Sequence, residues 1–292
     1  MMLKRLDPSP VVVGLFFAHL AALIFGLVGL LYVLPNLGKF ADDPNALKVY
    51  QWSMDYAGSV HIIFGALAML AFGIRFLGVR KTALFAGLTY VISLTSELLG
   101  TGTGWPFGNY SYTDFLGWKV LDHVPYTIPM SWFYMGLASY LLGSLIAERM
   151  GKGESILWTC GLGTWFLTVW DLVLDPAMAH SSLRVKFWEW HETGPYYEMP
   201  IKNLVGWSVT GLIFMLASRI AWGEKAETRG MSQLPLAIYV ANIMFAMVVS
   251  ADVGLWVPIM LSAVLGILPA AWIMRDRVAR PAPARPVLSP DA

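Results

Sequence analysis

Three acidic residues within apolar segments are the side chains best suited to do chemistry. Glu97 lies near the end of one apolar stretch, and Asp171 and Asp175 are four residues apart near the end of another. An α-helix turns once per 3.6 residues, so the two aspartates lie on one face, one turn apart. Burial in an apolar medium penalises the charged carboxylate, and a buried neutral carboxylic acid is a proton donor.

Hydroxyl residues continue these two faces. Thr89 and Ser93 precede Glu97 at intervals of four residues, and Thr164 and Thr168 precede the aspartates on their own segment. Such stripes are also typical of hydrogen bonds that join neighbouring membrane helices. The stripes therefore indicate either a polar path to the acids or helix packing.

Other polar residues lie at the start of apolar segments, at the same end of the expected bundle as the acids. His61, Asn203 and Trp207 each lie near the start of such a segment. His61 fits a catalytic or a structural role equally well, whereas His19, alone among apolar neighbours, favours a structural role. Because Asp175 precedes a proline, it could also simply mark the end of a helix.

The composition predicts a membrane protein. Of 292 residues, 57% are hydrophobic and 13% are charged, about half the charged fraction of an ordinary soluble domain. Cys160 is the single cysteine, so a disulfide scaffold is excluded. A net charge of +1 gives no field that would attract nucleic acid, and we expect no nucleic-acid partner.

Eight segments are long and apolar enough to cross the hydrocarbon layer, which takes roughly 20 residues of helix. The first is too long for a signal peptide and lacks a cleavage site. The last two are separated only by a tight turn, residues 252–254, and are the least secure pair. The expected spans are Val11–Leu34, Ser59–Leu77, Thr82–Leu99, Thr127–Ala147, Ser155–Leu174, Leu204–Trp222, Leu234–Ala251 and Leu255–Met274.

The sequence therefore predicts an all-α, polytopic transmembrane bundle with one domain over residues 1–274. The Pro-rich tail over residues 275–292 is expected to have no structure. Fourteen of the 20 Lys and Arg residues fall on the side that holds both termini. By the positive-inside rule that side is cytoplasmic, so we expect a multi-pass protein of the cytoplasmic membrane of a prokaryote.

Three long connections lie on the opposite side, at residues 35–58, 100–126 and 175–203. The last two are rich in Trp, Tyr, Gly and Pro rather than in charge, so we expect them to fold against the bundle and the acids. An aromatic belt at the membrane interface is the alternative.

Sequence motifs for common cofactors are missing. The chain has no P-loop, no Rossmann glycine pattern and no HExxH, and His19 and His61 lack a second pair at ligand spacing. Carboxyls, aromatic side chains and a membrane suit cofactor-independent addition of water to an alkene. An acid protonates the double bond, aromatic faces stabilise the cation, and a positioned water captures it.

Long motifs in the loops carry a family resemblance. ELLGTGTGWPFGNYSYTDFLG, VPYTIPMSW, DLVLDP and WEWHETGPYYEMPIKNLVGW resemble the integral-membrane carotenoid biosynthesis family, which includes carotenoid 1',2'-hydratases and bisanhydrobacterioruberin hydratases. The resemblance implies a hydro-lyase without a cofactor that adds water to the terminal double bond of an acyclic carotenoid end, of the gamma-carotene or lycopene type. A lycopene cyclase, which protonates a similar bond, is the alternative activity.

The resemblance also implies a set of site residues. Glu97, Asp171 and Asp175 match acidic positions of the family, and Asn203 and Trp207 match its NxxGW motif. We expect Glu97 or Asp171 to donate the proton and Asp175 with Asn203 to hold the water. Glu198, where a small residue is expected, would be a further acid if it pointed inward. The expected substrate-binding residues are His61, Trp105, Tyr110, Trp132, Trp188, Tyr197 and Trp207.

The expected partners are a lipid-soluble carotenoid, water and membrane lipid. A transporter is a further alternative, but it predicts polar residues along a whole path, and the cytoplasmic halves of the spans are almost wholly apolar. A pigment-binding subunit would need no buried acids.

Overall fold

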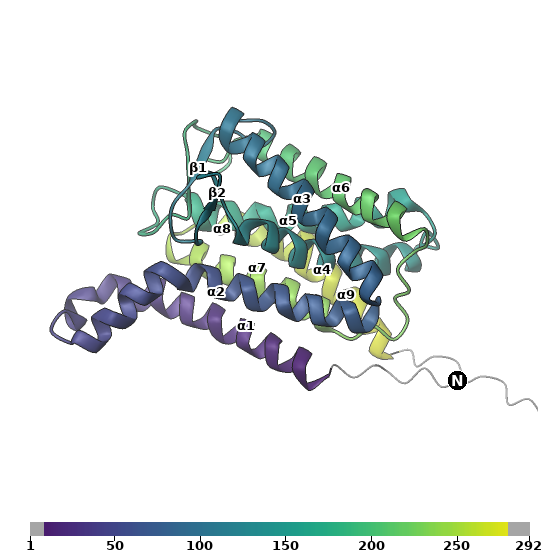
Figure 1. The fold of residues 1–292 in the computed structure, drawn as a ribbon, viewed down its shortest axis with the longest axis horizontal. Helices are drawn as coiled ribbons and strands as arrows, with labels where there is room; N and C mark the ends of the chain where they lie inside the picture. Colours follow the sequence, from purple (N-terminus) through teal and green to yellow (C-terminus); the bar gives the residue numbers. More distant parts are fainter. Residues whose placement is uncertain (1–8, 280–292) are drawn as a thin grey trace, which may run out of the picture.

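The computed structural model describes residues 9–279, and these hold eight helical segments long and apolar enough to cross a membrane (Figure 1). The expected helical bundle and its eight long apolar helices are therefore present, as a membrane bundle requires. The described elements are α1 (Pro10–Val28), η1 (Gly29–Val33), η2 (Leu34–Phe40), α2 (Pro44–Phe76), α3 (Val79–Thr103), β1 (Tyr110–Tyr112), β2 (Lys119–Val120), β3 (Val124–Pro125), α4 (Thr127–Arg149), α5 (Ile156–Ala179), β4 (Trp188–Trp190), α6 (Ile201–Trp222), α7 (Leu234–Asp252), α8 (Trp256–Ser262), η3 (Ala263–Ile267) and α9 (Leu268–Ala279).

Helix α4 forms the centre of the bundle and packs against α2, α3, α5 and α7. Its side chains Trp132, Tyr134 and Tyr140 are almost wholly buried. Two glycines let α4 and α5 approach closely, since a Cβ on Gly143 would lie 2.3 Å from the backbone nitrogen of Gly163. Small residues at such crossings allow backbone contact between membrane helices.

The second span starts earlier than predicted, because α2 begins at Pro44 rather than near Ser59. The side chain of Asp43 caps this helix by accepting from the backbone N–H of Asn45 over 2.8 Å, and Pro44 takes the first helical position. The prediction of a loop over residues 35–58 is therefore wrong for most of that range. With 33 residues, α2 is about 50 Å long, which exceeds the hydrocarbon thickness.

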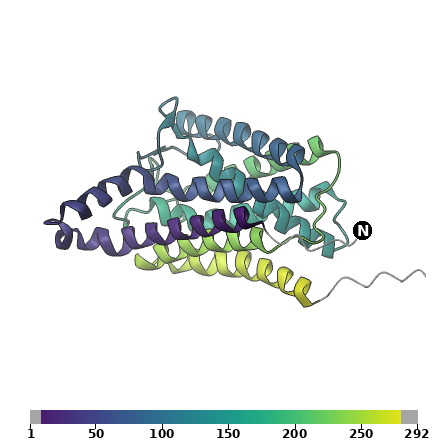
Figure 2. The same cartoon turned by 60° about the horizontal axis from the view of Figure 1, so that its bottom comes forward.

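Together α1, η1, η2 and α2 form a helical hairpin that projects past the other helices (Figures 1 and 2). The predicted tight turn between the last two spans is present, since α7 ends at Asp252 and α8 starts at Trp256. The tail prediction is partly wrong, because α9 continues to Ala279. The rest of the predicted tail, residues 280–292, lies outside the described residues.

Two aromatic-rich connections pair with each other as an antiparallel ribbon, so the structure is not purely helical. Strands β1 and β4 place Tyr110 opposite Trp190 and Tyr112 opposite Trp188. Strands β2 and β3 form a second short ribbon. Helix α5 continues through Pro176 to Ala179, so Asp175 does not end the helix.

Candidate active site

A cavity of about 80 Å³ lies where the β1–β4 ribbon meets the helices. Glu97 on α3, Asp175 on α5 and Asn203 on α6 contribute polar groups to its wall. Aromatic side chains form much of the remaining wall: His61, Phe107, Tyr110, Tyr112, Trp132, Tyr134, Trp170, Phe187, Trp188, Trp190, Trp207 and Phe245. The structure thus brings acids from separate helices together in one mainly apolar space, which we call the acid cavity.

The carboxylate of Glu97 is buried and accepts three hydrogen bonds. Trp132 donates from Nε1 to Oε1 over 2.9 Å, Tyr112 donates to Oε2 over 2.8 Å, and the hydroxyl of Tyr110 also donates to Oε2. The two tyrosines face the same way because alternate residues of a strand share a side, and Ser111 between them is exposed. This set of donors fixes the position of the Glu97 carboxyl.

Asp175 and Asp171 form a buried pair joined by one amide. Asn203 donates from Nδ2 to Oδ2 of Asp175 and, over 3.0 Å, to Oδ2 of Asp171. Trp188 on β4 donates from Nε1 to Oδ1 of Asp175 over 2.7 Å. Asp171 is fully buried behind Asp175, and its Oδ1 has no hydrogen-bond partner among residues 9–279. The pair therefore reaches the acid cavity through Asp175.

Three tryptophans that line the acid cavity contact one another. The rings of Trp132 and Trp207 stack with 3.9 Å between their centroids and an angle of 21°. Trp170 meets Trp207 edge to face at 5.7 Å. Aromatic faces attract cations, and the attraction strengthens where water is excluded. The arrangement can therefore stabilise a positive charge that forms next to the carboxyls.

Most of the predicted site residues meet here. The acid cavity is lined by the predicted residues Glu97, Asp175, Asn203, His61, Tyr110, Trp132, Trp188 and Trp207. Two expected substrate-binding residues lie elsewhere. Trp105 follows the end of α3 and is 64% exposed, and Tyr197 packs against Tyr196 in the loop before α6. The sequences WPFG and PYY contain these residues, but they do not show which aromatic ring points into the cavity. In WPFG that ring is Phe107 and not Trp105.

Glu198 does not point into the acid cavity. Its carboxylate accepts from the backbone N–H of Ser181 over 2.8 Å and from the hydroxyl of the same residue. Partial burial alone would raise the pKa of Glu198, but these hydrogen bonds and nearby His180 lower it below the ordinary value. The Glu198 carboxylate therefore holds the loop at Ser181 and is not a third acid of the cavity.

The histidines differ in their surroundings. His19 is wholly buried between the carbonyl of His61, 2.7 Å from its Nδ1, and the amide of Asn242, 3.1 Å from its Nε2. Asn242 also accepts from Tyr134 over 2.8 Å. These contacts join α1, α2, α4 and α7, in agreement with a structural role for His19. His61 instead stacks on Phe245 at 5.8 Å and lines the acid cavity.

Several wall residues were missed by sequence reasoning. Tyr112 was not predicted, although the alternation in YSY would have placed it beside Tyr110 if a strand had been expected. The remaining missed aromatic residues are Phe107, Tyr134, Trp170, Phe187, Trp190 and Phe245.

The hydroxyl residues of the two predicted stripes differ in their contacts. Thr168 forms a hydrogen bond with Ser208 of α6 over 3.1 Å, which agrees with helix packing. Oγ1 of Thr89 is buried with no partner in the described part of the chain.

Over the described range, no group of three or more His, Cys, Asp or Glu side chains is close enough to hold a metal ion.

Fold and site define a multi-pass membrane protein with an acid-bearing aromatic cavity at one end of its helices. A profile of the carotenoid biosynthesis protein family matches residues 57–269, and the chain belongs to this family. It is 28% identical over 250 residues to the bisanhydrobacterioruberin hydratase of Haloarcula japonica, an alignment that covers 84% of this chain and 80% of the relative. No solved structure matches the chain.

Proposed function

We propose that the protein is a carotenoid hydratase that adds water to the terminal C1'=C2' double bond of an acyclic carotenoid end of the gamma-carotene or lycopene type. The similar hydratase of Haloarcula japonica supports the class of reaction. The observation that carries the proposal is the meeting of Glu97 and Asp175 in one aromatic-walled cavity. Acids and aromatic faces in one apolar space are what protonation of an alkene requires.

The reaction needs one proton donor, one water and one base. A carboxylic acid transfers its proton to C2', and the electron pair of the double bond forms the new C–H bond. The cation at C1' is tertiary. Water attacks this carbon through oxygen and then loses a proton to a carboxylate, which leaves a tertiary alcohol. The net change is the addition of one water, and a proton returned to the donor completes the cycle.

The two carboxyl environments support different roles. Three donors surround Glu97, a setting that stabilises a carboxylate. Two carboxyls bridged by Asn203 can share one proton, because both cannot ionise easily at close range. We therefore assign the proton donor to the Asp171–Asp175 pair, with Asp175 facing the substrate. Glu97 stabilises the cation and accepts the proton from water.

This assignment revises the roles expected from the sequence. From the sequence, we expect Glu97 or Asp171 to donate the proton and Asp175 with Asn203 to hold the water. Asp171 lies behind Asp175 in the structure, so it acts on the alkene only through its neighbour.

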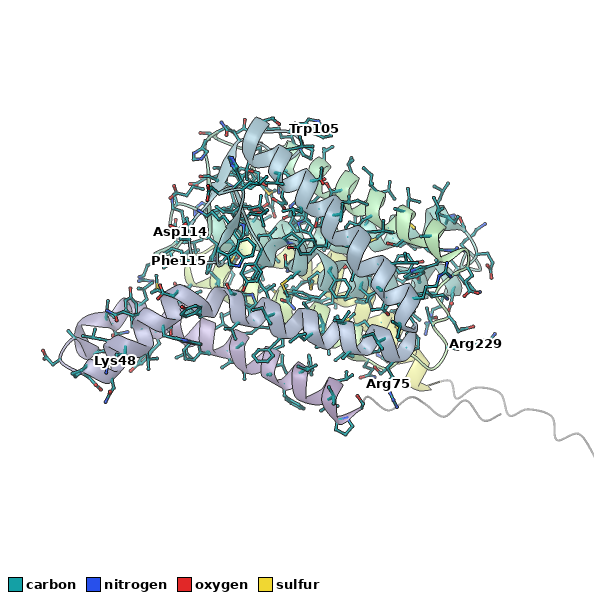
Figure 3. The ribbon with its side chains drawn as sticks, viewed as in Figure 1. Lys48, Arg75, Trp105, Asp114, Phe115 and Arg229 are labelled. Carbon is teal, nitrogen blue, oxygen red and sulfur yellow. The ribbon has the colours of Figure 1, made fainter. Side chains whose placement is uncertain are left out.

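The acid cavity is placed on the extracytoplasmic side in this proposal. Trp105, Asp114 and Phe115 lie at the end of the bundle near the cavity, and Arg75 and Arg229 lie at the opposite end (Figure 3). The excess of Lys and Arg near that opposite end supports a cytoplasmic location for it, and for both termini. The host membrane is then the cytoplasmic membrane of a prokaryote.

Expression in a lycopene-producing host tests the activity. Extracted pigments analysed by mass spectrometry should contain a product heavier by one water, and its hydroxyl should be tertiary. A product of unchanged mass with a shifted absorption spectrum would indicate a cyclase. Unaltered pigment at full expression of the folded protein would contradict both activities and would favour a pigment-binding or transport role.

A further inference from the structure

A second, larger cavity of about 300 Å³ lies along the helical hairpin of α1, η1, η2 and α2. None of its lining residues is Asp, Glu, Lys or Arg. Phe25 and Val28 on one side and Val49 on the other are partly exposed, so the cavity is flanked by apolar surface at the outside of the bundle. We call it the hairpin groove. Its mainly apolar lining suits an apolar chain and offers no Asp, Glu, Lys or Arg to pair with a charged ligand.

The hairpin groove and the acid cavity share part of a wall. His61, Phe187 and Phe245 line both spaces. His61 and Phe245 stack at 5.8 Å with an angle of 25° between their planes. These three side chains come from α2, the loop before β4, and α7. The two spaces are therefore neighbours, with these three residues between them.

The size of the acid cavity makes a second space necessary. At about 80 Å³ it holds the end of a carotenoid but not the whole molecule, which is a rigid rod of about one hydrocarbon thickness, roughly 30 Å. The rest of the rod has to leave the acid cavity through an apolar wall. The shared wall leads into a space without charged side chains.

We propose that the hairpin groove binds the polyene chain of the carotenoid whose end group lies in the acid cavity. This inference rests on the proposed function and adds the site that holds the non-reacting part of the substrate. His61, Phe187 and Phe245 contact the polyene where it passes from one space to the other. Binding energy gained along the groove positions the terminal double bond against Asp175.

The local helix geometry agrees with a site built for an elongated ligand. The first span changes from α-helix to π-helix at Gly29–Val33 and then to 3-10 helix at Leu34–Phe40, and both stretches line the groove. Short π-helical stretches are frequent at functional sites. Small residues on both helices, Ala22, Gly29, Ala46 and Ala57, leave the space that the polyene would fill.

Gly29 and Gly14 provide a matched test, because both lie on the first span and neither has an atom within 4 Å of an added Cβ. Gly29 lines the groove, whereas Gly14 does not. Gly29→Trp fills the groove, and Gly14→Trp adds the same ring elsewhere. The substrates are lycopene and a C15 isoprenoid ester with the same isopropylidene end but too short to need the groove. Lycopene that co-purifies with each variant is measured by absorbance.

For Gly29→Trp we expect lycopene turnover and co-purified lycopene to fall about tenfold or more, as when a substrate no longer fits an apolar pocket. Turnover of the short substrate should stay within about twofold, and Gly14→Trp should behave as wild type for both substrates. If Gly29→Trp fails to fold, Ala22→Phe, also on the groove wall, replaces it.

Two results would overturn the groove assignment. One is lycopene turnover and binding in Gly29→Trp equal to those of Gly14→Trp. The other is a loss of co-purified phospholipid without a loss of lycopene turnover, which would make the groove a lipid site. If the wild type hydrates neither substrate, that result would instead contradict the proposed function.

Discussion

The indole of Trp132 donates a hydrogen bond to Glu97 over 2.9 Å, and the face of the same ring stacks on Trp207. One side chain of the central helix thus fixes a carboxyl and forms part of the aromatic wall. Because α4 is buried among other helices, this position is held by rigid packing. Rigid support matters for a carbocation, which reacts with any base that is within reach.

Replacement of Asp175 by Asn retains its shape and removes its proton. We expect turnover to fall about 10²- to 10⁴-fold, the usual contribution of a general acid. Asp171→Asn should lower turnover less, because that carboxyl does not line the acid cavity. Asp114→Asn is the control, since this exposed residue pairs with Lys119 in the connection between α3 and α4. Turnover of Asp175→Asn close to that of Asp114→Asn would discard the assignment of the donor.

Trp132→Phe removes one hydrogen-bond donor and keeps an aromatic ring. Oxygen Oε1 of Glu97 then loses its partner, a change that costs about 1–3 kcal/mol when the group stays buried. We expect a lower unfolding temperature and a lower turnover. Trp207→Phe keeps the stack and removes no hydrogen bond described for residues 9–279, so its effect should be smaller. The opposite order of the two variants would contradict this role for the indole.

The contact between α4 and α5 gives a prediction about stability. Gly143→Ala places a methyl group against the backbone of Gly163 and should destabilise the protein by about 1–3 kcal/mol. Gly161→Ala, with no atom within 4 Å of the added Cβ, is the matched control and should be close to neutral. Thermal unfolding in detergent measures both. Equal unfolding temperatures would show that the helices can separate without cost.

The Glu198 loop gives a prediction about pH. Partial burial raises the pKa of Glu198, but the hydrogen bonds from Ser181 and the neighbouring charge lower it below the ordinary value of 4.5. The Glu198 carboxylate therefore contributes to the stability of the folded protein above that pH. The contribution is lost as the pH falls through the lowered value of the folded state. Wild type should therefore unfold at a higher temperature than Glu198→Gln at pH 7, and the difference should shrink below pH 4.5. A constant difference over this range would contradict the role of the charge.

The sequence could predict the spans because the hydrocarbon layer demands long apolar helices, and hydropathy reports this demand directly. Helix boundaries outside the hydrocarbon follow other rules. At Asp43 and Pro44 an N-cap starts α2 well before its apolar part, so a hydropathy boundary at Ser59 is too late. Pro176 was likewise expected to permit a helix end, yet α5 continues through it.

The acids were predictable because a buried carboxyl is costly and therefore uncommon in a membrane span. Most of the aromatic wall was not. Tyr112 and Trp190 reach the site through pairing of two loops that are distant in sequence, and a pairing of three residues leaves almost no local pattern. For Trp105 and Tyr197, residue type suggested a role in binding that their positions do not support.

Isotope labels in the solvent follow the atoms that the enzyme adds to the substrate. Purified wild type and Asp175→Asn in lipid vesicles are given lycopene in water labelled with ¹⁸O and deuterium. We expect wild type to produce a tertiary alcohol with one solvent oxygen and one solvent deuterium on the adjacent carbon, and Asp175→Asn to lose most of this product. A wild-type product without solvent oxygen, or equal labelled product from Asp175→Asn, would contradict hydration with Asp175 as the proton donor.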